Sequence, residues 1–138
     1  MKIALICTDN DSLCLGMRSI AAALKTHGYH SRLIFAKIGE RTYTTNTLDE
    51  IQKLSTDYDV IGISCLAQGS NKAKQLLEYM KPNHKITVWG GIHASLNPGD
   101  CTDWVDYVCM GEGEGMIVEL MENLSSSRSC KDILNVAY

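Results

Sequence analysis

The sequence predicts an α/β fold of three layers, in which a five-stranded parallel sheet of flavodoxin-like strand order 2-1-3-4-5 lies between two layers of helices. Short apolar runs alternate with segments of helical periodicity along the whole chain. Runs that are apolar almost throughout are typical of parallel strands covered on both faces. Right-handed crossovers leave few ways to connect five such units, and a chain of 138 residues favours the flavodoxin-like order among them.

The first strand and the first helix are predicted from a change of period near residue 12. Residues 2–8 contain an unbroken apolar run. Residues 13–27 then carry Met17, Ile20 and Leu24 at the three- and four-residue spacing of an amphipathic helix. A strand that leads directly into such a helix is the first unit of the predicted fold.

The later units follow the same alternation and are separated by residues that end helices. Gly28 ends the first helix, Asp57 and Asp59 precede the third strand, and Pro82 ends the third helix. The remaining predicted strands are residues 31–36, 60–65, 86–89 and 106–110. The remaining predicted helices are residues 48–57, 71–80, 99–104 and 115–124.

A polar segment divides the chain near its end. Residues 125–129 read Ser-Ser-Ser-Arg-Ser, a composition typical of a linker. Residues 133–138 then have the apolar pattern of a strand. We therefore expect residues 1–124 to form one domain, and residues 125–138 to be a linker and the start of a following domain. A C-terminal edge strand is the alternative interpretation.

Charge and composition argue against several classes of partner. The formal net charge is −3 and the Lys and Arg residues form no cluster, whereas nucleic acids and anionic membranes are bound through clustered positive charge. No apolar run is long enough to cross a bilayer, and no secretory signal precedes the first strand. We expect a cytoplasmic globular protein that binds neither nucleic acid nor membrane.

The six cysteines do not predict a metal site. They stand at positions 7, 14, 65, 101, 109 and 130, and no two have the Cys-x-x-Cys spacing of zinc or thioredoxin-type sites. An iron–sulfur cluster would need several cysteines close together. Cys7, Cys65 and Cys109 lie within predicted strands, where cysteine is usually a small buried residue. We expect reduced structural thiols, no metal ligands and no catalytic residues in this chain.

The unusual residues gather at one edge of the predicted sheet. In this fold, ligands bind outside the carboxyl ends of the strands, where the strand order reverses. Residues 9–16, 64–69, 90–93 and 111–115 all follow strands at that edge. The pattern therefore predicts a ligand site before any family is considered.

The residues at this edge allow more than one role. Gly90 and Gly91 would let a ligand approach the backbone closely, although a glycine pair also serves a turn. The Ser64 hydroxyl can bond a ligand or cap the following turn. His93 can bond a ligand or donate to a backbone carbonyl. These alternatives stay open from the sequence.

Residues 111–115, Gly-Glu-Gly-Glu-Gly, do not predict a phosphate loop. Such a loop needs a lysine and bare backbone N–H groups, and the carboxylates of Glu112 and Glu114 would repel an anion. The two carboxylates can instead accept hydrogen bonds from hydroxyls or amides of a ligand. Alternatively, they stabilise the N-terminus of the following helix through its dipole.

Four segments together resemble the cobalamin-binding domain found at the N-terminus of cobalamin-dependent radical SAM enzymes. Residues 58–64 read Tyr-Asp-Val-Ile-Gly-Ile-Ser, residues 88–94 read Val-Trp-Gly-Gly-Ile-His-Ala, and residues 106–114 read Asp-Tyr-Val-Cys-Met-Gly-Glu-Gly-Glu. Residues 11–16, Asp-Ser-Leu-Cys-Leu-Gly, match the Asp-x-His-x-x-Gly motif of the wider family, except that Leu13 replaces the histidine that ligates cobalt.

The resemblance implies a site for cobalamin whose dimethylbenzimidazole tail has left the cobalt and entered the crevice. By position, Ser64 and Leu66 would line the tail pocket, and Gly90 and Gly91 would give the tail room. Leu13 would face the lower side of the corrin without ligating the metal, which implies a base-off, His-off state. The complete set of expected cofactor-binding residues is Leu13, Leu15, Gly16, Ser64, Cys65, Leu66, Gly90, Gly91, His93, Gly111, Glu112 and Gly113.

Two details of this assignment follow from the resemblance alone. Gly111 and Glu112 would border the nucleotide loop of the cofactor. Asp9 and Asp11 offer two registers for the first motif, and both registers stay open at this point.

The resemblance also implies that the chain is the corrinoid-carrying part of a larger enzyme. In the family, a C-terminal radical SAM domain of the same polypeptide binds a 4Fe–4S cluster and S-adenosylmethionine, often to transfer a methyl group. This sequence lacks the cysteines for that cluster, so no catalysis is expected from it alone. The alternative is a flavodoxin-like interaction or regulatory module without a corrinoid.

Three other proteins of related fold fit the sequence less well. A phosphorelay receiver would need an aspartate at the end of the third strand, where Ser64 stands. Residues 8–12 are too acidic for the phosphate loop of a flavodoxin. The Gly-x-Gly-x-x-Gly motif of dinucleotide-binding enzymes does not follow the first strand.

Overall fold

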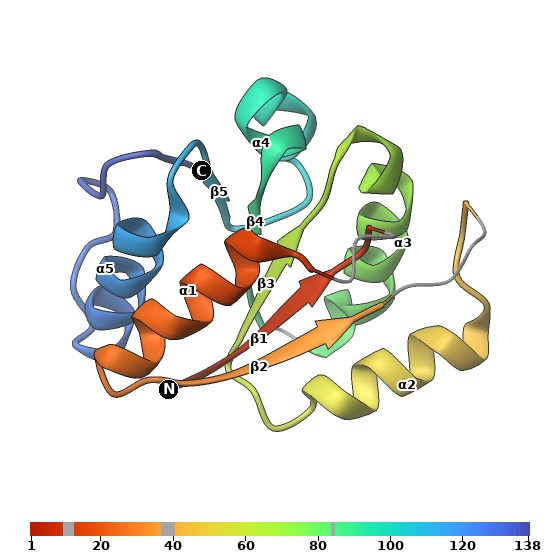
Figure 1. Cartoon of the computed structure of the whole chain (residues 1–138), viewed down its shortest axis with the longest axis horizontal. Helices are drawn as coiled ribbons and strands as arrows, with labels where there is room; N and C mark the ends of the chain where they lie inside the picture. Colours follow the sequence, from red (N-terminus) through yellow and green to blue (C-terminus); the bar gives the residue numbers. More distant parts are fainter. Residues whose placement is uncertain (10–12, 37–40, 84) are drawn as a thin grey trace.

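A computed structural model describes residues 1–9, 13–36, 41–83 and 85–138 of the chain (Figure 1). Among these residues, six strands form one sheet in the order β2-β1-β3-β4-β5-β6. The first five strands pair in parallel, as predicted. The strands are β1 (Lys2–Cys7), β2 (His30–Phe35), β3 (Val60–Ser64), β4 (Ile86–Gly90), β5 (Tyr107–Cys109) and β6 (Val136–Ala137).

Helices connect the strands and form the two outer layers. They are α1 (Leu15–Thr26), α2 (Thr45–Ser55), α3 (Ser70–Met80), α4 (Ile92–Leu96) and α5 (Gly113–Ser125). Short 3₁₀ turns occupy Ala67–Gly69, Lys81–Asn83 and Pro98–Asp100. The α/β class and the order of the five parallel strands are therefore confirmed.

The fourth predicted helix was placed wrongly. The sequence pattern favoured residues 99–104, but the helix is α4, which starts two residues after β4 ends. Ile92 and Leu96 of α4 are exposed, and the helix buries His93 and Ala94. A five-residue helix with outward-facing apolar side chains has no amphipathic pattern, so periodicity could not find it.

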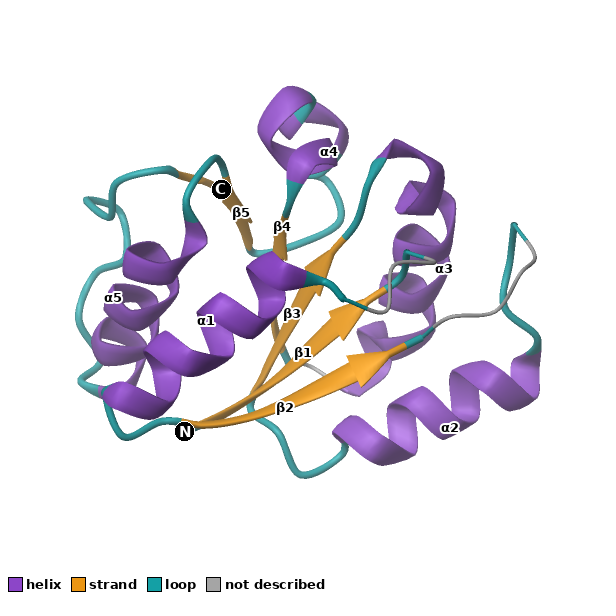
Figure 2. Ribbon diagram, in the orientation of Figure 1, coloured by secondary structure: helices purple, strands orange, loops and turns teal. Residues whose placement is uncertain are grey.

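The two faces of the sheet carry separate hydrophobic cores. Figure 2 shows α1 and α5 together on one side of the sheet, and α2 and α3 on the other. The α1/α5 core includes Leu5, Leu24 and Leu120. The opposite core includes Trp89 and Leu76, both fully buried. Side chains alternate along each strand, so neighbouring residues contribute to different cores.

The C-terminal segment packs on the domain. After α5, Cys130 and Ile133 are buried in the α1/α5 core. Val136 and Ala137 then form β6, which pairs antiparallel with β5 at the edge of the sheet. The predicted sheet of five strands thus gains a sixth. The interpretation of residues 125–138 as the start of a following domain stays a prediction.

Within the described parts of the chain, none of the helices has the length and apolar character that a bilayer span requires.

Candidate functional site

A cavity of about 150 Å³ lies between the sheet and the helices α1 and α5; we call it the α1/α5 cavity. It opens at the carboxyl ends of the central strands, where the sequence predicted a ligand site. Its apolar walls come from both helices and from the middle of the sheet, and its polar side chains come from the end of β3 and the start of α5. The lining residues are Leu5, Gly16, Met17, Ile20, Gly62, Ile63, Ser64, Val88, Gly90, Gly91, Cys109, Gly111, Glu112, Gly113, Glu114, Met116 and Ile117.

Small residues on one face of β3 and β4 create the space. Leu5, Gly62 and Val88 form one row across the paired strands, and Ser64 is paired with Gly90 nearer the carboxyl ends. A Cβ atom at Gly62 would lie 3.0 Å from Cδ2 of Leu5. Gly62 and Leu5 both line the cavity, so a side chain at Gly62 would have to displace Leu5 within it. A glycine inside a strand often marks a place where another group approaches the backbone closely.

Gly91 has a different role from Gly62. Its φ of 92° lies in the region that favours glycine, and a Cβ atom there would be 2.6 Å from Oγ of Ser64 and 3.1 Å from the carbonyl oxygen of Cys65. The backbone N–H of His93 donates to that carbonyl at 3.2 Å. Gly91 thus allows the start of α4 to approach the end of β3, and its absent side chain does not face open space.

The loop after β5 closes the cavity against α1. A Cβ atom at Gly113 would lie 2.9 Å from Cδ1 of Ile20, so α5 begins in close contact with α1. Hydrogen bonds from the Ser19 hydroxyl and from backbone N–H groups hold the pKa of Glu114 below its usual range. The backbone N–H of Gly111 donates to Oγ of Ser95 at 2.8 Å. Glu114 therefore joins two helices, and the loop holds no lysine for a phosphate.

The end of β1 meets the end of β3 through an aspartate. Both carboxylate oxygens of Asp9 accept from the backbone N–H of Leu66, at 3.0 and 2.8 Å. A Cβ atom at Gly69 would be 2.6 Å from Oδ1 of Asp9. Asp9 is therefore used to position the loop after β3. Asp11, the other aspartate of the first motif, lies outside the described residues.

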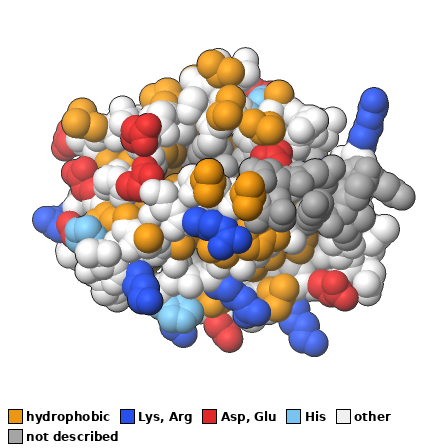
Figure 3. All heavy atoms as spheres, viewed as in Figure 1, with side chains coloured by type: hydrophobic (Ala, Val, Ile, Leu, Met, Phe, Trp, Pro, Cys, Tyr) orange, Lys and Arg blue, Asp and Glu red, His pale blue; other side chains and the backbone are white. Residues whose placement is uncertain are grey.

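Leu13 and Leu15 lie at the surface beside the start of α1. Their exposed fractions are 64% and 72%, and the carbonyl of Leu13 accepts from Nε of Arg18 at 2.6 Å. Ile92 and Leu96 of α4 are also exposed. Figure 3 shows apolar side chains over α4 and near the start of α1, on the side where the strands end. This edge of the domain thus presents unusual apolar surface.

Besides Leu13 and Leu15, three of the expected residues do not line the α1/α5 cavity. Cys65 is buried in the opposite core, where its Sγ accepts from Nε1 of Trp89 at 3.3 Å. Burial raises the pKa of the Cys65 thiol to about 12. Leu66 does not line the cavity; it is half-buried in the loop held by Asp9. The side chains of Cys65 and Leu66 therefore do not line the α1/α5 cavity.

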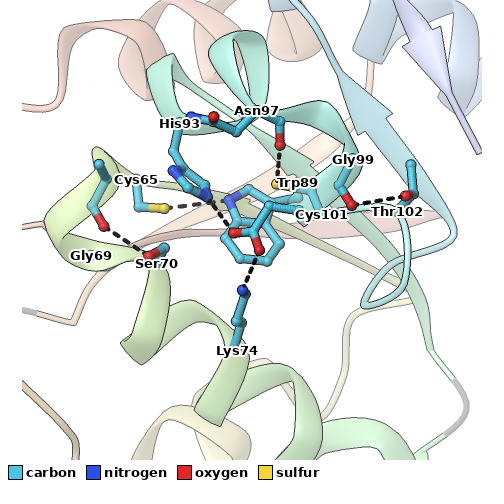
Figure 4. A network of polar contacts seen from close by, with 12 residues as sticks. Cys65, Gly69, Ser70, Lys74, Trp89, His93, Asn97, Gly99, Cys101 and Thr102 are labelled. Carbon is cyan, nitrogen blue, oxygen red and sulfur yellow. Dashed lines mark hydrogen bonds and ion pairs between the residues drawn. The ribbon is translucent and has the colours of Figure 1, made fainter.

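His93, the third of these residues, belongs to a polar network on the α3 side of the sheet (Figure 4). Its Nε2 lies 2.9 Å from Oδ2 of Asp100, and Nζ of Lys74 lies 2.6 Å from Oδ1 of the same carboxylate. Hydrogen bonds from Lys74 and then from His93 hold the pKa of Asp100 below its usual range. The ring stacks at a tilt on Trp89, and Nδ1 is buried with no hydrogen-bond partner among the described residues.

The structure thus brings together most of the expected set. Those that line the α1/α5 cavity are Gly16, Ser64, Gly90, Gly91, Gly111, Glu112 and Gly113. Sequence reasoning missed the apolar walls, which are Leu5, Met17, Ile20, Gly62, Val88, Met116 and Ile117 among others. Gly62 carried a usable signal, because a glycine within an otherwise apolar strand is unusual.

A larger hollow of about 690 Å³ lies at the opposite, amino-terminal edge of the sheet. Two of its charged residues, Lys85 and Asp106, form hydrogen bonds within the protein. Nζ of Lys85 donates to the carbonyls of Ser55, Thr56 and Tyr58. Oδ2 of Asp106 accepts from Thr87. No cluster of three or more His, Cys, Asp or Glu in the described ranges could hold a metal ion. The smaller α1/α5 cavity is therefore the better candidate site.

Comparison with protein families gives one match across most of the chain. The B12 binding domain matches residues 1–121. Cytidylyl-2-hydroxyethylphosphonate methyltransferase of Streptomyces wedmorensis is 29% identical over an alignment 144 positions long. This alignment covers 90% of this chain and 27% of that protein. Bacteriochlorophyllide d C-8(2)-methyltransferase of Chlorobaculum tepidum is 26% identical over 72 residues, which cover 52% of this chain and 16% of that protein.

Solved structures share the fold. The radical S-adenosylmethionine methyltransferase TsrM from Kitasatospora setae superposes with a TM-score of 0.82 and 14% identity over 97% of this chain and 27% of that chain. A second TsrM structure, with cobalamin and a 4Fe–4S cluster bound, gives a TM-score of 0.78 at 15% identity. The chain spans about a quarter or less of the length of these proteins.

Proposed function

We propose, from the premise that this chain belongs to the B12-binding domain family, that it holds cobalamin in a base-off, His-off state with the nucleotide tail in the α1/α5 cavity. One observation carries the proposal. The row of small residues on β3 and β4 opens a cavity of about 150 Å³ at the carboxyl edge of the sheet, and an apolar cavity of that size can hold a single aromatic ring.

The residues of the cavity fit a flat base that carries a polar chain. Leu5, Val88 and Ile117 offer apolar contact in the interior, where burial of a ring is favourable. Ser64 and Glu112 lie toward the opening and can donate to or accept from a ribose or an amide. Backbone atoms of the glycine-rich loop after β5 can do the same. Among the described residues, no basic side chain lines the cavity, so recognition would rest on shape and on hydrogen bonds to Ser64, Glu112 and the backbone.

Leu13 supports the His-off part of the proposal. It has no lone pair, so it cannot ligate a metal, and its exposed side chain offers an apolar surface beside the opening of the cavity. Bound cobalamin would supply a cobalt centre whose axial ligands set its redox and methyl-transfer chemistry. The chain itself would bind the corrinoid, orient it, and withhold a histidine ligand from its lower side.

The domain would act as one part of a radical SAM methyltransferase. Its relatives by sequence are methyltransferases, and the matched regions cover only 16% and 27% of those proteins. The cluster and S-adenosylmethionine would bind to a C-terminal domain of the same polypeptide. Sequence of the gene beyond Tyr138 tests this part: a Cys-x-x-x-Cys-x-x-Cys motif is expected, and a stop codon there would refute it.

The corrinoid part is tested by binding. The purified chain is mixed with hydroxocobalamin, desalted, and examined by visible absorption. The expected result is a retained corrinoid with the bands of the base-off form. A colourless protein would contradict corrinoid binding, and a retained corrinoid with base-on bands would contradict insertion of the tail.

A further inference from the structure

A pair of cysteines flanks the loop between β1 and α1. Cys7 is the last residue of β1 and is 2% exposed, whereas Cys14 directly precedes α1 and is partly exposed. The Sγ atoms lie 2.6 Å apart. That distance exceeds the length of about 2.05 Å of a disulfide bond but is well below the ordinary contact distance of two sulfur atoms. The two side chains therefore already point at each other.

The backbone of Cys14 is unusual for a residue other than glycine. Its φ of 39° and ψ of 55° are left-handed, a conformation that costs a non-glycine residue about 1 kcal/mol or more. Cys14 holds the capping position of a twelve-residue helix without a capping hydrogen bond from its side chain. A thiolate at the N-terminus of a helix is stabilised by the helix dipole.

The other cysteines differ from this pair. Burial raises the pKa of the Cys101 and Cys109 thiols to about 11, and that of Cys65 still further. Cys130 is buried in the core, with its Sγ near the carbonyl of Arg128. Buried thiols of raised pKa react slowly, because the thiolate is the nucleophile. Cys14 is thus the cysteine placed to react first.

We propose that Cys7 and Cys14 are a modification site, a dithiol that a small-molecule disulfide such as oxidised glutathione converts to an intramolecular disulfide. The Cys14 thiolate attacks one sulfur of glutathione disulfide and releases one glutathione, which leaves a mixed disulfide. Cys7 then loses its proton to solvent, attacks the Cys14 sulfur and releases the second glutathione. The protein dithiol loses two electrons, and glutathione disulfide is reduced to two glutathione molecules.

The bond would tie the two ends of the β1–α1 loop together beside the α1/α5 cavity. Cys7 pairs in register with Ser64, and Gly16 follows Cys14 by two residues; both of these neighbours line the cavity. Oxidation would therefore restrain the segment that carries Leu13. This inference does not depend on which ligand the cavity holds.

The sequence offers a direct test. Trypsin cleaves after Lys2 and Arg18, and residues 3–18 contain no other cleavage site, so one peptide carries both cysteines. The chain is incubated with glutathione disulfide, unfolded, alkylated and digested. The expected peptide carries no alkyl group and has lost two hydrogen atoms in mass. The remaining four of the six cysteines should be alkylated.

Two single variants test the order of the steps. In Cys7→Ser, the mixed disulfide has no resolving thiol, so Cys14 should accumulate with one glutathione attached. In Cys14→Ser, the buried Cys7 should stay reduced. Cys109→Ser is the matched control and should form the Cys7–Cys14 bond as the unaltered chain does. Alkylation of both cysteines after excess oxidant, or a bond from Cys7 to a different cysteine, would overturn the proposal.

Discussion

The two faces of the central strands differ in a way that explains the site. On the face toward α1 and α5, the carboxyl halves of β3 and β4 carry Gly62, Ser64 and Gly90. On the opposite face, the same strands carry Ile61 and Trp89, both almost fully buried. The backbone is the same for both faces, so the cavity exists because side chains are missing on one side only. The candidate site thus results from small residues on one face of a regular sheet.

The two faces also differ in how their polar side chains are bonded. On the α3 side, Asp100 bonds to Lys74 and His93, so its polar network is largely satisfied within the protein. At the cavity, Ser64 and Glu112 lie at the opening. We propose that the face toward α1 and α5 binds a ligand, whereas the opposite face serves chiefly stability.

Filling the α1/α5 cavity should have the largest effect on cofactor retention. Gly62→Val places a branched side chain in the row between Leu5 and Val88, in a strand position that valine favours. Corrinoid affinity should fall about a hundredfold, because burial of a ring contributes about 3 kcal/mol and each 1.4 kcal/mol is about a factor of ten. Equilibrium titration followed by visible absorption measures it.

The matched control for Gly62→Val is Ile61→Val, on the other face of the same strand. It should lower the free energy of unfolding by about 1 kcal/mol and leave corrinoid affinity unchanged. Equal loss of affinity in both variants would contradict the division between the two faces.

Gly91→Ala should chiefly reduce stability. The left-handed φ and the approach to Ser64 and Cys65 are expected to cost about 1–3 kcal/mol of the free energy of unfolding, which denaturant unfolding measures. A larger residue at Gly91 is therefore a poor probe of the cavity, in contrast to Gly62. A variant as stable as the unaltered chain would show that α4 can start without this glycine.

Leu13→His should change the spectrum of the bound cofactor and little else. Leu13 is exposed, so the free energy of unfolding should change by less than about 0.5 kcal/mol. A histidine at this position should shift the visible bands toward nitrogen ligation. An unaltered spectrum in a variant that retains the corrinoid would mean that Leu13 does not lie beneath the metal.

Asp100→Asn should have the smallest effect. It should lower the free energy of unfolding, and only at pH values above the acidic range. The pKa of Asp100 in the folded state is lowered by Lys74 and His93. Its contribution to the free energy of unfolding is therefore fully present above about pH 4, the usual range of an aspartate. That contribution is lost as the pH falls through the lowered pKa. Because the side chain is partly exposed, the loss should stay below about 1 kcal/mol. Midpoints of thermal unfolding over a pH series should converge for the two proteins only at acidic pH.

The sequence predicted the strands well because each is a short apolar run bounded by polar residues. It failed at α4, where Ile92 and Leu96 face outward, and it left the pairing of residues 136–137 undecided because an edge strand depends on a neighbour distant in sequence.

The candidate site could be predicted from the sequence only in part. Glycines at strand ends, such as Gly90, signal a site by themselves. Met17, Ile20 and Met116 line the cavity, yet as helix residues at apolar positions they could not be told from ordinary core. Only the packing of α1 against α5 reveals which of these side chains faces a space.

Whether the nucleotide tail enters the α1/α5 cavity is tested most sharply by comparing two corrinoids in two proteins. Cobinamide lacks the nucleotide tail that cobalamin carries, so affinities of both for the unaltered chain and for Gly62→Val form a double-mutant cycle. If the tail occupies the α1/α5 cavity, cobalamin should bind the unaltered chain about a hundredfold more tightly than cobinamide, and Gly62→Val should remove that advantage. An equal preference for cobalamin in both proteins would contradict the account.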